Sequence, residues 1–341
     1  MKKLITLSML FMAAVVFAQE EDSKKFTISG SVDAYYQTYL TAPDDQAPSF
    51  GTAFAGQSGF SVGMGNIIAS YEGENVGAVL DLVTGARGAG ATFNSDIVNG
   101  IVNQAYVYWN VSEGTKLTFG RFNTFLGYEV ISPAANFNYS TSYLFSSGPF
   151  SHVGLKADFA LSEDFSLMLA ITNPWDTNDT SSSGEYALGA QLGYKGQFLN
   201  LYYDSGNNDG LGFEIDYTGG FDMTDSFFLG INAAYNDNDG QGFYGAALYP
   251  QLATSDAFSI GLRGEYFSLH GDGDDYPSVF ATTLTGSYTI DNLIIKPEIR
   301  LDALSNADGG IFYPDGSNVI DNDGLPTDSL AAFTLAAILT F

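Results

Sequence analysis

Beyond residue 25, hydrophobic and polar residues alternate with a period of two in one segment after another. In segment 211–218 the odd-numbered residues are Leu, Phe, Ile and Tyr, and the even-numbered ones are Gly, Glu, Asp and Thr. Segment 293–302 repeats this arrangement, with its charges at even positions only. Successive side chains of a strand point to opposite faces, and the 3.6-residue period of helices is hard to find. The pattern therefore predicts an all-β protein whose strands have one apolar and one polar face.

Sixteen such segments follow one another along the chain. They are expected at residues 26–40, 59–71, 75–84, 102–111, 115–122, 151–161, 165–173, 185–195, 197–204, 211–220, 225–236, 242–252, 257–269, 279–290, 293–302 and 329–341. Tight turns alternate with longer polar loops, the latter at 41–58, 85–101, 174–184, 205–210, 237–241, 270–278 and 303–328. Short turns at one rim and long loops at the other, with an even strand count, are typical of an antiparallel up-and-down outer-membrane barrel. Both termini of such a barrel lie in the periplasm.

The amino-terminal residues resemble an export signal. Two lysines precede an apolar run over residues 4–16, and small residues stand at 16 and 18. We expect residues 1–18 to be a signal peptide and residues 19–341 to be the barrel. No apolar run after Ala18 reaches 18 residues, so the sequence offers no transmembrane helix. A membrane protein would then have to span the bilayer as a closed barrel.

Aromatic residues gather at both ends of the strands. Two girdles at the membrane interfaces are predicted: a periplasmic one from Phe159, Phe165, Tyr194, Phe198, Tyr217 and Phe227, and an outer one from Tyr203, Phe213, Tyr235, Tyr244, Tyr266 and Phe280. The last strand ends on Phe341, which we interpret as the signal for the barrel assembly machinery. The alternative, a periplasmic β-sandwich, gives little reason for aromatics at both strand ends.

Composition narrows the function classes. The chain has 39 Asp and Glu against 12 Lys and Arg, a net charge of −27, and no Cys. Clustered basic residues for binding phosphates are missing, which argues against a nucleic-acid partner. The absence of Cys excludes disulfides and thiolate chemistry.

If the polar faces of the strands point inward, they line a water-filled pore. The predicted pore-lining charges are Asp33, Asp81, Asp158, Glu185, Asp204, Glu214, Asp216, Glu265, Glu298 and Asp302, with Lys156, Arg263, Lys296 and Arg300. Ten carboxylates against four cations predict a negative lumen that concentrates cations. The alternative is that many of these charges pair with one another and merely hydrate the wall.

The longest connection between neighbouring strands in the first half of the barrel, residues 123–150, is richer in apolar residues than an exposed loop should be. A loop of this length is usually functional, and folding it into the barrel would cover its apolar side chains. We expect it to narrow the pore, with Arg121, Glu129 and His152 at the constriction. Arg121 shares its parity with Leu117 and Phe119, so it faces inward only if a bulge intervenes. The alternative places the loop on the extracellular rim.

Three segments carry a resemblance to a known family. They are 119–129 (FGRFNTFLGYE), 138–140 (NYS) with 147–154 (SGPFSHVG), and 30–36 (GSVDAYY). In these segments the chain resembles the OmpL-like β-barrel porin family. The resemblance implies an outer-membrane porin with a constriction loop after the fifth strand, and it says little about the substrate.

The sequence thus favours a porin for passive diffusion of small hydrophilic solutes. One alternative is a substrate-selective channel, for example for sugars, with Tyr106, Tyr108, Tyr202 and Tyr249 as stacking surfaces; another is a plugged adhesin or structural barrel without conductance. Two His residues are too few for a His-based metal site, and we expect no catalytic activity, metal centre or cofactor. Acidic loop runs such as 237–240 are expected to form turns. A further hypothesis is that loop carboxylates bridge to lipopolysaccharide through divalent cations, and trimers are expected by analogy.

Overall fold

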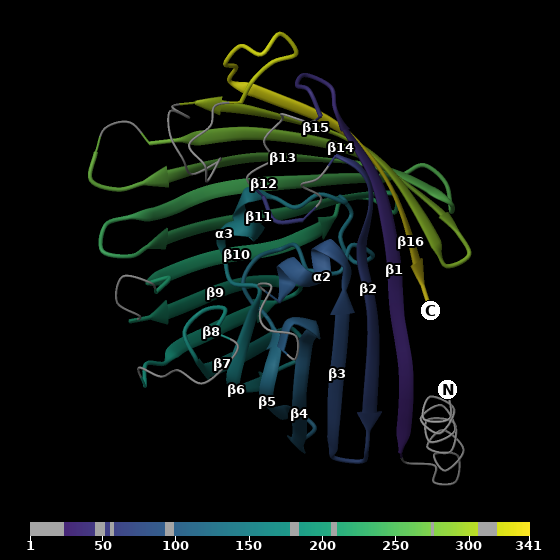
Figure 1. Ribbon diagram of the computed structural model, residues 1–341. Coiled ribbons are helices and arrows are strands. Elements are labelled where there is room, and N and C mark those ends of the chain that lie inside the picture. Colours follow the sequence, from purple (N-terminus) through teal and green to yellow (C-terminus); the bar gives the residue numbers. More distant parts are fainter. Residues whose placement is uncertain are drawn as a thin grey trace, which may run out of the picture.

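The computed structural model of the chain is a closed barrel of sixteen antiparallel strands (Figure 1). It describes residues 24–44, 52–54, 58–92, 99–177, 184–205, 210–273, 276–305 and 319–341. The strands are β1 (Lys25–Tyr39), β2 (Gly59–Glu72), β3 (Val76–Thr84), β4 (Val102–Ser112), β5 (Thr115–Asn123), β6 (Ser151–Ala160), β7 (Phe165–Thr172), β8 (Ala187–Tyr194), β9 (Gln197–Asp204), β10 (Phe213–Asp222), β11 (Phe227–Asp237), β12 (Gly242–Ala253), β13 (Phe258–His270), β14 (Ser278–Ile290), β15 (Leu293–Ser305) and β16 (Ser329–Thr340). Each strand pairs with its neighbours in sequence, and β1 pairs with β16. The predicted fold class is confirmed.

The predicted strand boundaries differ from the observed ones by three residues at most. Two details of the prediction are wrong. Glu185 was expected within the eighth strand, but β8 begins at Ala187, so Glu185 precedes it. Residues 237–241 were expected to form a long loop, yet Asn238 and Gln241 form a bridge around Asp239 and Gly240. Both central residues have positive φ, 54° and 85°, as in the tight turns that suit the twist of a hairpin.

The outer face of the barrel is apolar and the inner face is mixed. On β14, Phe280 and Leu284 are 56% and 45% exposed, whereas the alternate residues Ala281 and Thr283 are fully buried. Every strand is hydrogen-bonded to a neighbour on each side. The backbone N–H and C=O groups of the wall are therefore satisfied within the barrel, as they must be in lipid, which offers no hydrogen-bond partners. The strand wall therefore fits a bilayer.

Several predicted girdle residues are direct cross-strand partners. Three pairs near the ends that carry the long loops, here called the loop end, are in register: Tyr203 with Phe213, Tyr235 with Tyr244, and Tyr266 with Phe280. At the opposite, short-turn end, Phe165 and Tyr194 pair with ring centroids 4.5 Å apart. Such pairs add stability beyond burial and place rings at one height on the wall.

The interior holds two short helices and a long loop (Figure 1). Helix α2 (Gly85–Ala91) lies between β3 and β4 together with the 3-10 helix η1 (Asn99–Ile101), and α3 (Tyr143–Ser147) lies in the loop between β5 and β6. Among the described residues no helix is long and apolar enough to cross a membrane. The helices fill space inside the barrel instead.

An apolar cluster occupies the loop end of the interior. Several of its members sit near the loop ends of β12 to β15 and on α3; they are Phe243, Phe267, Val279, Leu304, Tyr143 and Leu144. A lumen that is polar throughout was expected from the alternation of the strands, and at the loop end this expectation is wrong. The inward parity of these strands is apolar at the loop end because it packs against the inserted loop.

Candidate pore constriction

The loop between β5 and β6 crosses the lumen, as predicted. Tyr139 and Ser140 donate their backbone N–H groups to the Glu298 carboxylate on β15, at 2.7 and 3.0 Å. The Tyr139 hydroxyl reaches across the seam where β16 closes onto β1 and donates to Asp33 on β1, at 2.5 Å. Elsewhere, the Gly127 N–H donates to Asp216 on β10, at 3.0 Å. The loop is thus tied to strands on several sides of the barrel.

Arg263 and Glu129 form the central ion pair of the constriction. The Arg263 Nη1 lies 2.7 Å from Glu129 Oε1, and the side chains are 0% and 3% exposed. The same guanidinium donates to the Ser140 carbonyl at 2.6 Å and to the Thr283 hydroxyl at 3.1 Å. Because burying a charge is costly without such partners, each member of the pair depends on the other. Glu129 therefore lies inside the barrel in a closed ion pair, and its place at a pore constriction stays a prediction.

A second set of contacts fixes α3. Glu265 accepts the backbone N–H groups of Tyr143 and Leu144 at 3.0 and 2.8 Å, at the start of the helix where such donors lack intrahelical partners. The Tyr143 hydroxyl donates to Asp302 at 2.7 Å, and Asp302 also binds Arg300 at 2.8 Å. Buried carboxylates of the wall thus serve as anchors for loop amides.

Arg87 on α2 anchors the inserted loop, and the sequence alone did not reveal it. It is 1% exposed and donates to the carbonyls of Ile131 and Tyr139 at 3.0 and 2.5 Å. Its guanidinium also lies 4.7 Å from the centre of the Phe54 ring. Residues 85–91 read GARGAGA, which has no amphipathic period, so nothing marked them as a helix. The available signal was a single arginine within an apolar Gly and Ala segment.

Apart from Glu185, which precedes β8, the predicted pore-lining charges fall into two groups. Eleven of them face inward and are buried: Asp33, Asp81, Asp204, Glu214, Asp216, Arg263, Glu265, Lys296, Glu298, Arg300 and Asp302. Lys156 and Asp158 are half-buried and pair at 3.1 Å. Of the predicted stacking residues, Tyr202 and Tyr249 are buried, while Tyr106 and Tyr108 are partly exposed. Their role as pore lining stays a prediction, because many of the buried charges bind the loop.

Arg121 and His152, the other two predicted constriction residues, both point inward. Gly120 has φ of 133°, which breaks the alternation, so that Phe119 is 64% exposed and Arg121 only 6%. Arg121 makes one long contact, 3.5 Å, to the Ala91 carbonyl. His152 is 1% exposed, lies 2.9 Å from the Thr124 hydroxyl and stacks on Phe125.

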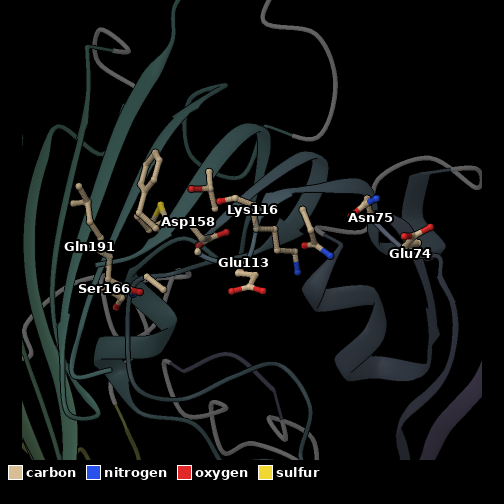
Figure 2. Close-up of a pocket in the computed structure, with 15 residues that line it drawn as sticks. Glu74, Asn75, Glu113, Lys116, Asp158, Ser166 and Gln191 are labelled. Atoms are coloured by element: carbon tan, nitrogen blue, oxygen red, sulfur yellow. The ribbon is translucent and has the colours of Figure 1, made fainter. Parts of the chain in front are cut away.

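Two cavities lie below the loop, toward the short-turn end. The larger is about 790 Å³ and is lined by the turn between β2 and β3 and by β4 to β8 with their turns. Figure 2 shows Glu113, Lys116 and Asp158 near its middle, with Glu74 and Asn75 on one side and Ser166 and Gln191 on the other. The smaller, about 410 Å³, is roofed by residues 134–138 of the loop and includes Lys296. We call the larger cavity the turn-end vestibule.

A turn between β7 and β8 fastens the end of the constriction loop. Asp176 accepts the backbone N–H groups of Phe150 and Ser151 at 2.8 and 3.0 Å. Burial raises the pKa of the Asp176 carboxyl to about 7, partly offset by these bonds and by Arg121. The carboxyl of a detached turn would titrate near its ordinary value, so docking takes up a proton between about pH 4 and 7.

The docking of this turn should weaken as the pH rises through 7. We expect hydrogen exchange of the Phe150 and Ser151 amides, corrected for intrinsic rate, to accelerate between pH 5 and 8. Asp176→Asn should remove this pH dependence and keep the amides protected at pH 8, whereas Asp239→Asn in an exposed turn should change nothing. Equal protection at both pH values in the unaltered protein would contradict the raised pKa.

Within the described ranges, no group of three Asp, Glu or His side chains has an arrangement that could hold a metal ion. The acidic turn at Asp321 uses its carboxylate for local bonds, accepting the N–H groups of Asp323 and Leu325 at 2.9 Å each. A third acidic run expected to form a turn covers residues 272–275, of which 274–275 lie outside the described residues.

A closed barrel with a lipid-facing exterior and a loop folded into its lumen defines an outer-membrane channel of the porin class. The chain belongs to the family described as Putative beta-barrel porin-2, OmpL-like, which matches residues 25–341. A comparison with curated proteins found no match.

Several solved structures share the fold. The outer membrane channel DcaP of Acinetobacter baumannii superimposes with a TM-score of 0.59 at 13% identity, covering 94% of this chain and 99% of its own. An anion-selective porin from Comamonas acidovorans gives 0.58 at 11% identity, with coverage of 93% and 100%. In-vitro folded OmpT of Vibrio cholerae gives 0.56 at 10% identity, with coverage of 95% and 99%. At these identities the likeness extends to the fold alone.

Proposed function

We propose that this porin passes small hydrophilic solutes by passive diffusion and prefers cations. The observation that carries the proposal is the lining of the turn-end vestibule, where the carboxylates Glu74, Glu113 and Asp158 stand beside one lining lysine, Lys116, while Lys156 pairs with Asp158 from outside the lining. Carboxylates at a narrowing with low-dielectric walls raise the local concentration of cations and repel anions. The Lys116 ammonium makes a cation–π contact with Tyr108, 4.2 Å from the centre of the ring.

The rims carry the same sign of charge. Acidic residues of the short-turn end, besides those of the vestibule, are Glu72, Glu163, Asp164, Asp222, Asp225, Asp256 and Asp291, and the loop end adds Asp237, Asp239, Asp272, Asp321, Asp323 and Asp328. An ion approaching from either side therefore meets a negative field first. Since one structural neighbour is described as an anion-selective porin, the fold itself does not set the sign. The side chains of this chain must supply it.

The orientation follows from the class. We place the short-turn end in the periplasm, where residues 1–18 would be removed as a signal peptide; they lie outside the described residues. A homotrimer is part of this proposal, and one structure of the Vibrio cholerae OmpT is described as a trimer form. The remaining proposed partners are lipopolysaccharide at the loop end and the assembly machinery that would read Phe341.

The cation preference is tested in a planar bilayer under a KCl gradient. We expect stable conductance steps with a cation-selective reversal potential. The double variant Glu113→Gln/Asp158→Asn should lower the cation-to-anion permeability ratio at least about fivefold. Each carboxylate about 7 Å from an ion contributes on the order of 0.6 kcal/mol in water, so two change the attraction of the cation alone by about sevenfold before salt screening. Removing Asp158 also frees Lys156, which adds to the shift.

Glu163→Gln is the matched control, because Glu163 lies in an exposed turn between β6 and β7, outside the vestibule lining. It should leave the ratio nearly unchanged. An unaltered reversal potential in the double variant would overturn the proposed role of the vestibule. No conductance at all from a correctly folded barrel would favour the plugged structural barrel.

A further inference from the structure

The smaller of the two cavities, about 410 Å³, has a partly exposed rim and a buried floor. The rim lies where four strands meet their short turns, and its inward side chains are Phe228 on β11, Gln251 on β12, Ser287 on β14 and Ile294 on β15. The floor consists of Glu129, Asn136, Asn138, Tyr249 and Lys296. A solute at the short-turn end can therefore reach the floor past the rim, into a space of the size of small-molecule pockets. We call it the loop-roofed cavity.

Two glycines of the strand wall make room for aromatic rings of the loop that line this cavity. A Cβ added at Gly230 would collide with the Tyr128 hydroxyl, and one at Gly261 would collide with the Phe137 ring. Tyr128 also stacks on Tyr249, the register partner of Gly230, with ring centroids 4.3 Å apart. The wall thus holds the rings in fixed positions, and they give the loop-roofed cavity flat apolar faces.

The two charged side chains that line the cavity are already bound by protein groups. Glu129 pairs with Arg263 at 2.7 Å. The Lys296 ammonium donates to the loop carbonyls of Pro133, at 2.8 Å, and Asn136. An anion entering the cavity would face the Glu129 carboxylate, and a cation would face the Lys296 ammonium, so either ion would be desolvated beside a like charge. A neutral solute avoids this cost.

Neutral polar side chains complete the lining. Asn138, Gln251 and Ser287 all line the cavity, and Asn138 uses one of its two N–H donors on the Thr285 hydroxyl at 2.7 Å. Amides and hydroxyls both donate and accept hydrogen bonds. A purely apolar solute would take water from these groups without replacing its hydrogen bonds, which is unfavourable. A ring that carries hydroxyl groups replaces those bonds and covers the aromatic faces at the same time.

We propose that the loop-roofed cavity binds a small neutral sugar on its way past the constriction loop. This inference rests on the proposed porin function, because it takes the bound sugar to be a solute in passage. It adds a saturable site between β11 and β15 to simple diffusion, separate from the acidic vestibule on β4 to β8.

The test measures binding directly, by saturation-transfer difference NMR of glucose added to the refolded full barrel in detergent micelles. We expect a signal that saturates with glucose concentration. Ser287→Ala removes a hydroxyl of the rim and Phe228→Leu removes a flat ring face. Together they should raise the Kd about tenfold, as expected for the loss of one hydrogen bond and one ring contact. Sorbitol, the open-chain polyol of glucose, should bind several-fold more weakly because it has no ring to lie on the aromatic faces.

The matched control is the double variant Ser70→Ala/Phe221→Leu, which makes the same two chemical changes outside the loop-roofed cavity. Ser70 lies on the inner face of β2, on another side of the barrel. Phe221 lies near the short-turn end of β10, 44% exposed on the outer face. This variant should leave the Kd for glucose unchanged. Heat-modifiable migration in gels shows that each variant has folded.

The outcomes separate the sugar site from the porin function, because conductance in the planar bilayer is measured independently of glucose binding. A glucose signal that does not saturate, or equal losses of affinity in the two double variants, would overturn the sugar site while the porin function stands. Equal affinities for glucose and sorbitol would overturn the assignment of a ring-shaped solute. A folded barrel that binds glucose but conducts no ions would overturn the passage of the sugar together with the porin function.

Discussion

Replacing Arg263 with Met is expected to release the constriction loop and to raise single-channel conductance. The guanidinium is fully buried and binds Glu129, Ser140 and Thr283. Its removal leaves the Glu129 carboxylate buried without a charge partner, a change that typically costs about 3–5 kcal/mol. The strand ladders do not pass through these contacts, so the cost falls on loop docking while the barrel remains closed. Single-channel recording should show larger and noisier steps.

Variants of Glu129 separate the contribution of the Arg263–Glu129 ion pair from the effect of shortening the Arg263 side chain. Glu129→Gln alone leaves Arg263 as the unpaired charge and should shift selectivity toward anions as well as loosen the loop. The double variant Arg263→Met/Glu129→Gln removes both charges and should recover part of the loop docking, which a double-mutant cycle quantifies. If Arg263→Met has unaltered conductance and noise, the loop is held by its backbone contacts and the ion pair is dispensable.

Those backbone contacts explain why so many wall carboxylates are buried. Glu298 and Glu265 each accept two consecutive backbone N–H groups of the loop, and Asp216 accepts one more, from Gly127. A carboxylate is well suited to gather neighbouring amides that have no carbonyl partner of their own. The counted excess of acids in the lumen therefore overstates the charge that a passing ion meets, and the vestibule carboxylates become the relevant ones.

The strands could be predicted because lipid imposes a strict rule on every one of them. A strand of a membrane barrel must alternate apolar and polar side chains, and a turn must separate it from the next strand. Boundaries such as those of β9 could therefore be predicted from residues 197–204 alone. The inward fold of the loop was legible for a related reason, since its apolar side chains needed cover. Both signals are one-dimensional.

The parts that escaped prediction depend on partners distant in sequence. Arg87 has meaning only once Tyr139 and Ile131 lie beside it. The inward turn of Arg121 depends on the φ of Gly120, which composition does not reveal. Each of these is a fact of three-dimensional packing rather than of periodicity.

Replacing Phe341 with Ser is expected to abolish most barrel assembly in cells while changing the stability of the folded barrel little. Phe341 is 56% exposed, so its half-buried ring contributes about 1 kcal/mol by burial. Its backbone exchanges two hydrogen bonds with Gly30, at 2.9 and 3.0 Å, and these close β16 onto β1 whatever the side chain. A large loss of folded barrel in cells would therefore report recognition of the ring by the assembly machinery.

The matched control is Leu339→Ser on β16, two residues before Phe341, at the same parity and 41% exposed. It removes a comparable apolar contact with lipid two residues earlier and should assemble. Heat-modifiable barrel in outer-membrane fractions is compared with refolding of the purified chains into lipid vesicles. Loss in cells with normal refolding in vesicles supports the terminal aromatic signal. Normal yield of the Phe341→Ser barrel in cells would show that assembly reads some other feature of β16, and equal losses in both settings would assign the effect to packing at the seam between β1 and β16.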